Sequence, residues 1–390
     1  MVIPQKRAVI LTGHFAIQKR KANILWLSDE LRANGWHVTF ITTGYSWVSW
    51  LRGDRRFKSL YGKPKIGTSI VDGTLTTIFQ YAPIHPFSLR STMLDRLARP
   101  FHRVFEAYWK KHLRAPLKDA DLVIVESGPP LMLAPYVAQF APDAALVYRV
   151  SDDVMLLGLP KFVRESELKF ASLFDRVSMA SPILAKVFVD HPGVAIDPIG
   201  VPKALYDNIL PDPFGSGRAQ REAVCAGTTQ FDMEAVLKIA HQRPLWRLHV
   251  LGRLRVDPPN NAPSNVVFHG EQSFRNTAAF IKHADIGLAP YLDRAGVEYQ
   301  TTQSNRILQY RYFGLPIIGP ERLCDPAIPS IFGYSDLAGD TLSSVLSKAE
   351  SYKGASPEAL PDWHDLYLRI VSTRKRPRSC AAADLKLSMQ

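Results

Sequence analysis

Cysteine is scarce in this sequence, and its scarcity excludes several classes of protein. The three cysteines, Cys225, Cys324 and Cys380, are far apart, and an odd number cannot pair completely. Because no CxxC pair is present, we expect neither a disulfide framework nor a zinc site. This use of cysteine fits a protein of a reducing compartment.

Long apolar runs and a dinucleotide fingerprint are also missing. The opening residues, MVIPQKRAVILTG, include no apolar stretch of signal-peptide length. The most apolar window, residues 129–148, holds four prolines and Asp143, which is incompatible with an ordinary membrane-spanning helix. The segment TGHFAIQK, which follows the first apolar run, lacks the GxGxxG pattern of dinucleotide-binding proteins. This absence argues against a dehydrogenase. We therefore expect a soluble or peripheral protein.

Acidic residues are too few to balance the basic ones, mainly in the first part of the chain. The formal net charge is +12, and residues 1–150 hold 21 Lys and Arg against 10 Asp and Glu. A charge concentrated in this way indicates an anionic partner, which could be lipid, a phosphorylated substrate or nucleic acid. A solvated basic surface without a partner is the alternative.

What the sequence does contain is a regular alternation of short apolar runs and amphipathic segments. Continuous apolar runs separated by helical patterns are typical of parallel strands covered on both faces. In the first half they predict strands over residues 8–12, 37–42, 122–126, 145–150 and 177–180. A second series after Gly200 predicts strands over 223–226, 246–251, 266–269, 286–290 and 316–318, with helices over 233–241, 274–283 and 304–313.

The two series predict an α/β protein with two domains. A chain of 390 residues is too long for one ordinary core. We predict two Rossmann-like, doubly wound parallel-sheet domains over residues 1–199 and 203–355. The segment 356–373 is expected to cross back to the first domain, and residues 374–390 form a basic flexible tail.

Carboxylates that follow strands are the first candidates for chemistry, because ligands of open α/β sheets bind beyond the carboxyl ends of the strands. Asp152 and Asp153 follow the strand 145–150, where either could be a general base whose proton affinity the other raises. Capping of the next helix is the alternative. Glu126 ends a neighbouring strand, where it could hold a site residue in place or act as an N-terminal helix acid.

Two segments of the second half could bind a nucleotide. Glu271 follows the strand 266–269, and a carboxylate there can accept both hydroxyls of a ribose. The run TTQSNR (301–306) opens a helix whose free N–H groups and dipole suit a diphosphate, and Arg306 adds a fork of donors. Ordinary capping of that helix is an equally good interpretation.

Two stretches of the first half, residues 45–60 and 93–118, interleave aromatic and basic side chains. This mixture is typical of an interfacial element on an anionic membrane. A core-facing helix with a solvated basic side is the alternative. Nucleic-acid binding is a third hypothesis, although no recognised motif for it is present.

Several stretches in a fixed order resemble the GumK family of glucuronosyltransferases of xanthan assembly. They are KRKANILWLSDEL (19–31), IHPFSLR (84–90), VIVESG (123–128), LVYRVSD (146–152), FHGEQSFRNTAAFIKHADIGLAPY (268–291) and SNRILQYRYFGLP (304–316). The resemblance runs to about Arg369. It implies the GT-B fold, with the two domains facing each other across a cleft. It also implies inverting transfer of glucuronic acid from a UDP donor to a lipid-diphosphate-linked oligosaccharide.

The resemblance also assigns roles to individual residues. The family's catalytic aspartate matches Asp152. The family has a lysine where this chain has Arg306, so the charge is kept, and Gln272 and Pro202 replace a family methionine and aspartate. The family's nucleotide-contacting residues match Gly227, Thr229, Glu271, Tyr291, Ser304, Asn305, Arg306 and Gln309.

The resulting hypothesis is a metal-independent glycosyltransferase of exopolysaccharide synthesis, peripheral at the cytoplasmic face of the inner membrane. Asp152 would take the proton of the acceptor hydroxyl, and Arg306 with helix N–H groups would stabilise the leaving diphosphate. We expect no metal, no cofactor and no nucleic-acid partner. The expected partners are a UDP-sugar, a lipid-diphosphate-linked oligosaccharide and an anionic membrane surface. The alternatives are a nucleotide-sugar epimerase on the same fold and a non-catalytic membrane-surface binding protein.

Overall fold

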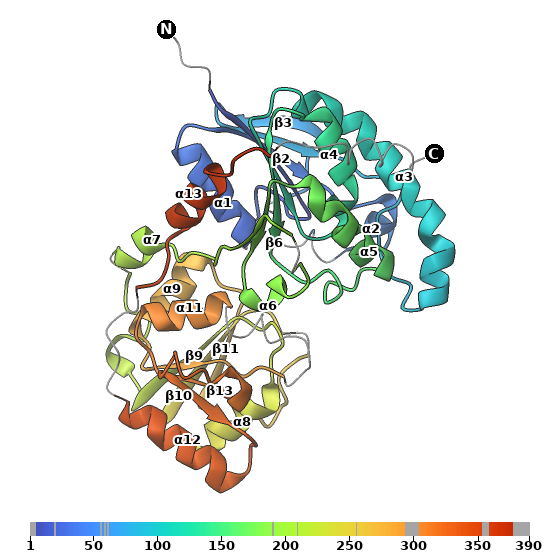
Figure 1. Ribbon diagram of the computed structural model, residues 1–390. Helices are drawn as coiled ribbons and strands as arrows, with labels where there is room; N and C mark the ends of the chain where they lie inside the picture. Colours follow the sequence, from blue (N-terminus) through green and yellow to red (C-terminus); the bar gives the residue numbers. More distant parts are fainter. Residues whose placement is uncertain are drawn as a thin grey trace. The chain divides into compact units, whose positions relative to one another are not determined.

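The chain separates into two compact units (Figure 1). The computed structural model describes residues 5–18, 21–54, 57, 60, 62–188, 191–208, 210–254, 256–292, 304–352 and 359–376. Unit 1 comprises the described residues up to Ile199 and those from Trp363 onward, and unit 2 comprises those from Gly200 to Asp362. Each unit is built on one β-sheet.

Unit 1 has an eight-stranded sheet with the order β3-β4-β2-β1-β5-β6-β7-β8. The chain moves outward from β1 first in one direction and then in the other, which is the doubly wound arrangement. Every pair is parallel except β3 with β4. The strands are β1 (Arg7–Thr12), β2 (His37–Thr42), β3 (Gly67–Asp72), β4 (Leu75–Phe79), β5 (Leu122–Glu126), β6 (Ala145–Val150), β7 (Arg176–Met179) and β8 (Val194–Ile196).

The antiparallel hairpin β3–β4 adds an edge to this sheet that the apolar pattern did not predict. Asp72 Oδ1 accepts hydrogen bonds from the backbone N–H and the hydroxyl of Thr74, both at 2.7 Å, which closes the turn. Most of β3 is exposed, so the strand carries no continuous apolar run. Antiparallel edge strands on otherwise parallel sheets are common.

The helices of unit 1 cover its sheet through apolar faces. In α3, Phe105, Trp109, Leu113 and Leu117 recur every four residues and are fully buried, which is the period of one helix face. The helices are α1 (Asn23–Ala33), α2 (Trp47–Leu51), α3 (Thr92–Leu117), α4 (Ala134–Phe140), α5 (Lys161–Phe170), α6 (Pro182–Ala185) and α13 (Trp363–Val371), with 3₁₀ turns η2 (Pro129–Leu133) and η3 (Ala171–Leu173).

The last helix, α13, packs on α1 and thereby belongs to unit 1. The rings of Trp363 and Trp26 stack with centroids 6.2 Å apart, and His364 Nδ1 lies 3.2 Å from Glu30 Oε2. Of the predicted return segment and tail, residues 356–358 and 377–390 lie outside the described residues.

Unit 2 has a parallel six-stranded sheet with the order β11-β10-β9-β12-β13-β14. Helices α8 and α12 supply one apolar core against the sheet, and α9 and α11 supply the core on the opposite face. The strands are β9 (Arg221–Ala226), β10 (Trp246–Leu251), β11 (Val266–Gly270), β12 (Ile286–Leu288), β13 (Ile317–Pro320) and β14 (Ile331–Tyr334). The helices are α7 (Lys203–Asp207), α8 (Met233–Gln242), α9 (Phe274–His283), α11 (Asn305–Tyr312) and α12 (Gly339–Ser351), with 3₁₀ turns η4 (Gly215–Gly217) and η5 (Glu321–Leu323).

Within the described parts of both units, none of the helices combines the length and the apolar character that a membrane span requires.

Candidate functional site

In unit 1 the candidate site lies where β1, β5 and β6 end at the same edge of the sheet. Glu126, at the end of β5, is buried and accepts hydrogen bonds from the hydroxyl of Thr12 and from Ser151 Oγ, the latter at 3.0 Å. The backbone N–H of Asp152 donates to Ser127 Oγ at 3.1 Å. Two hydrogen bonds therefore attach the loop that carries Asp152 to the end of β5. Glu126 holds this loop and also binds Thr12 at the end of β1.

The two adjacent aspartates after β6 have different surroundings. Asp153 Oδ1 forms an ion pair with Arg164 Nη2 at 2.5 Å and accepts the backbone N–H of Met155 at 2.7 Å. Arg164, on α5, also pairs with the fully buried Glu167. Asp153 is thus the residue that caps the following turn, whereas Asp152 is half-buried at the sheet edge.

The sequence analysis missed His14, a further proton-carrying group at this edge. His14 follows β1, its side chain is about half exposed, and its Nε2 lies 3.9 Å from Glu126 Oε2. Its backbone N–H donates to Thr12 Oγ1 at 3.0 Å. The available signal was its place directly after the first strand, in the segment TGH.

In unit 2 the loops after three adjacent strands are tied together by backbone hydrogen bonds. The N–H of Gly227 donates to the carbonyl of Leu251, and the N–H of Gly252 donates to the carbonyl of Gly270, both at 2.7 Å. Gly252 has φ +127°, and a Cβ there would lie 3.1 Å from the Thr228 side chain. This close approach requires glycine and brings the three loops to one edge of the sheet.

The start of α11 lies against the same edge. Ser304 caps the helix by accepting the N–H of Ile307 at 3.2 Å, so the capping interpretation is correct for this residue. The Ser304 hydroxyl also lies 2.8 Å from the hydroxyl of Tyr291. Thr301, Thr302 and Gln303 lie outside the described residues.

Arg306 projects from α11 onto the loop after β9. Its Nε donates to the carbonyl of Ala226 at 2.8 Å, Nη2 donates to the carbonyl of Gly227, and the guanidinium lies 4.6 Å from the Tyr291 ring centroid. Nη1 is buried and has no protein partner among the described residues. The guanidinium therefore both holds the loop and keeps one donor uncommitted.

The contacts bring four of the predicted nucleotide-binding residues together, namely Gly227, Tyr291, Ser304 and Arg306. Gln309 is buried on α11, one turn after the start of the helix. Thr229 and Glu271 are exposed just beyond the ends of β9 and β11, and Asn305 is exposed at the start of α11.

Sequence reasoning also missed a buried chain of ionisable residues in the sheet of unit 2. Glu222 on β9 and His249 on β10 lie in the mainly apolar strands REAVCA and WRLHVL, and His249 contacts Glu222 and His269 on β11. Polar residues inside a buried strand were the available signal. Among the described residues, no group of three or more His, Cys, Asp or Glu side chains is arranged to hold a metal ion.

Comparisons with known proteins agree with this architecture. Residues 10–180 match the family model for the N-terminal domain of glucuronosyltransferase GumK. The chain is 26% identical over 380 residues to a UDP-glucuronate:glycolipid 2-beta-glucuronosyltransferase of Xanthomonas campestris pv. campestris, covering 95% of this chain and 90% of that protein.

Two solved structures show the fold. Anabaena HepE in complex with UDP and glucose superimposes with a TM-score of 0.59 at 13% identity, covering 95% of this chain and 99% of that one. A UDP-forming trehalose-phosphate synthase from Burkholderia vietnamiensis gives a TM-score of 0.58 at 13% identity, covering 99% and 97%. The predicted GT-B class of two α/β units is confirmed.

Proposed function

We propose that the chain is a GumK-like glycosyltransferase that transfers glucuronic acid from UDP-glucuronate to a lipid-linked oligosaccharide, with inversion and without a metal. The relative from Xanthomonas supports the donor and the glycolipid class of the acceptor through its named activity. The position of Asp152, half-buried just beyond the carboxyl end of β6 in a loop attached to β5, is the observation on which the chemical step depends.

Asp152 is the proposed general base. Glu126 is held by Thr12 and Ser151, and Asp153 is held by Arg164, so each has a structural role in the same loop. Asp152 would accept the proton of an acceptor hydroxyl, whose oxygen attacks the anomeric carbon from the face opposite the UDP. A single displacement of this kind inverts the anomeric centre.

The donor diphosphate is proposed to bind at the start of α11. The helix N-terminus supplies N–H groups and a partial positive charge, and Arg306 supplies a formal charge and the uncommitted Nη1. As the glycosidic bond breaks, negative charge grows on the diphosphate, and donors fixed in advance stabilise it. Glu271 is proposed to accept the ribose hydroxyls.

The first half of α3 is proposed to rest on an anionic membrane at its cytoplasmic face. Leu97 and Phe101 are 62% and 63% exposed, and the basic side chains Arg96, Arg99 and Arg103 lie between and beside them. The second half of α3 has one face buried in the core and the opposite face exposed. The interfacial interpretation is therefore proposed for the first half of this helix, and the core-facing interpretation describes the second half.

The short helix α2 belongs to the same proposed surface. Trp47 and Trp50 are 50% and 57% exposed there, whereas Phe57 packs with the buried aromatic cluster around Tyr45. Arg55, Arg56 and Lys58 of the predicted stretch lie outside the described residues.

The test is a transfer assay with UDP-glucuronate and a lipid-diphosphate-linked oligosaccharide. We expect UDP release that requires the glycolipid, and a decrease of about 10²- to 10⁴-fold in Asp152→Asn with UDP affinity unchanged. Full activity of the variant would reassign the base. UDP-sugar conversion without any acceptor would favour the epimerase, and absence of UDP binding would favour the non-catalytic membrane protein.

A further inference from the structure

A chain of three ionisable side chains crosses the sheet of unit 2. His249 Nε2 lies 2.8 Å from Glu222 Oε2, and His249 Nδ1 lies 2.8 Å from His269 Nε2. Glu222 is fully buried and His249 is 5% exposed. The chain therefore links the amino-terminal part of β9 to the carboxyl end of β11.

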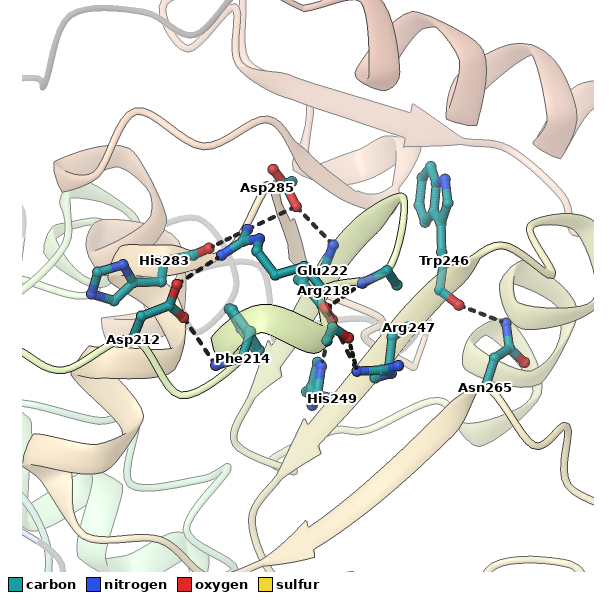
Figure 2. Close-up of polar contacts among 12 residues, drawn as sticks. Asp212, Phe214, Arg218, Glu222, Trp246, Arg247, His249, Asn265, His283 and Asp285 are labelled. Carbon is teal, nitrogen blue, oxygen red and sulfur yellow. Dashed lines mark hydrogen bonds and ion pairs between the residues drawn. The ribbon is translucent and has the colours of Figure 1, made fainter.

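The surroundings keep the Glu222 carboxylate directed at His249. The backbone N–H of Ala219 donates to its other oxygen, Oε1, at 2.8 Å, and Arg247 Nη1 lies 3.8 Å away (Figure 2). The nearby Arg218 is engaged elsewhere, since it pairs with Asp212 and Asp285. The aromatic rings of Phe214 and Phe280 pack around His249 on the side of α9.

When both imidazole rings are neutral, only one arrangement of protons satisfies the hydrogen bonds between Glu222, His249 and His269. Burial lowers the pKa of His249, and burial together with His249 lowers the pKa of His269, so both rings are neutral near pH 7. Glu222 accepts the Nε2–H of His249. The remaining nitrogen, His249 Nδ1, then accepts the Nε2–H of His269. The Glu222 carboxylate thereby fixes the orientation of the His269 ring, acting through His249.

The fixed ring belongs to the end of β11, directly before the loop that carries Glu271. The His269 carbonyl accepts the side-chain N–H of Gln272 at 2.8 Å, and the Gly270 carbonyl accepts the N–H of Gly252 at 2.7 Å. Together with the ring contact to His249, these bonds hold the loop by three separate attachments. The residue that follows, Glu271, is exposed.

We propose that Glu222, His249 and His269 form a tether that positions Glu271 on the ribose of the nucleotide donor and so determines the preference for a ribonucleotide. His249 is a positioning residue in this proposal. The inference rests on the proposed function, because it takes Glu271 as the ribose acceptor. A purely structural network would stabilise the sheet without affecting the preference for a ribonucleotide over a deoxyribonucleotide.

The test compares UDP with 2′-deoxy-UDP, with each affinity measured by calorimetry on the full chain. Wild-type protein should prefer UDP by about tenfold or more, as expected for a hydrogen bond to a charged acceptor. Glu271→Ala and His249→Leu should both bring the ratio of the two affinities close to one. His249→Asn, which keeps an acceptor near the position of Nδ1, should recover part of the preference.

Two further variants keep the test interpretable. His249→Leu leaves Glu222 buried without its partner, so the double variant Glu222→Gln with His249→Leu is measured alongside it. Asn265→Ala is the matched control, because Asn265 binds the carbonyls of Ala240, Arg243 and Trp246 at the opposite end of β10 (Figure 2). It should lower the melting temperature and leave the affinity ratio unchanged.

In one outcome, His249→Leu and the double variant keep the wild-type ratio of the two affinities while Glu271→Ala loses it. That result would overturn the tether and leave the donor site in place. A ratio retained by all of these variants, Glu271→Ala included, would overturn the tether and also remove Glu271 from the proposed donor site. A ratio lost in Asn265→Ala would overturn the tether too, because general destabilisation would then explain the effect.

Discussion

Arg164 Nη2 lies 2.5 Å from Asp153 Oδ1, directly beside the proposed base Asp152. The pair is mostly buried, with side-chain exposures of 17% and 22%. The same guanidinium also pairs with the buried Glu167 on α5. The ion pair compensates a second negative charge that would otherwise stand next to the base.

Removal of the guanidinium should therefore shift the pH dependence of transfer. In Arg164→Met, the unpaired charge of Asp153 disfavours the ionised form of its neighbour, so the acid limb of kcat/KM should move to higher pH by about one unit. Arg164→Lys should restore the wild-type profile. The double variant Arg164→Met with Asp153→Asn should restore it as well, and an unrestored profile would indicate a loss of loop structure instead.

Replacement of Arg306 should weaken donor binding. In Arg306→Ala the binding of UDP is expected to weaken by about 1–3 kcal/mol, the range for losing a hydrogen bond from a charged group. Arg306→Lys keeps the charge but loses the two bonds to the Ala226 and Gly227 carbonyls, and should lie between. Calorimetry with UDP gives the dissociation constants. Lys238→Ala, which removes an exposed charge on α8, is the control, and an equal effect there would contradict the specific role.

Binding to anionic vesicles should depend on the first half of α3. Leu97→Ser with Phe101→Ser should reduce the fraction of protein that sediments with phosphatidylglycerol vesicles, because exposed apolar area is lost. Neutralising Arg96, Arg99 and Arg103 to Gln should reduce it further and remove much of its salt sensitivity. Leu368→Ser, a 50% exposed leucine on α13, is the matched control. Unchanged sedimentation in the α3 variants would exclude this surface.

Close packing of β12 against α11 predicts a steric effect in unit 2. A Cβ on Gly287 would lie 2.5 Å from Tyr310 Cδ2, so Gly287→Ala is expected to lower the free energy of unfolding by about 1–3 kcal/mol. Gly217→Ala, where a Cβ would meet nothing within 4 Å, should be tolerated. Urea denaturation compares the two variants, and similar midpoints would refute the predicted clash.

The buried His249 should make stability depend on pH. Its pKa is lowered from the ordinary 6.5 by burial, so the unfolded chain takes up the proton first. The stabilisation from the neutral ring is complete above about pH 6.5 and is lost as the pH falls below it. Melting temperatures between pH 5 and pH 8 should decline less steeply toward acid in the variant with Glu222→Gln and His249→Leu. An unaltered slope would show that other groups dominate.

Much of the fold could be predicted because its central strands are buried on both faces. β1, β5, β6, β9 and β10 appear in the sequence as mainly apolar runs, and each lies within about two residues of its predicted bounds. β3 was missed because it is an exposed edge strand whose residues do not need to be apolar. α12 was missed as well, although its apolar residues have a helical period.

The contacts of the candidate site were harder to predict than its residues. A sequence shows that Arg306 opens a helix, but it does not show that the side chain reaches carbonyls about 80 residues earlier in the chain. The partners of His249 are likewise 27 and 20 residues away, on two different strands. Local patterns cannot encode such pairings, because strand order and register determine them.

The packing of α13 on α1 also has a consequence for the order in which the molecule is made. Unit 2 is one uninterrupted piece of chain from Gly200 to Asp362, whereas unit 1 is assembled from two pieces on either side of it. During synthesis, the whole of unit 2 emerges before Trp363 can reach its place against Trp26. Unit 1 therefore begins to form first and is completed last.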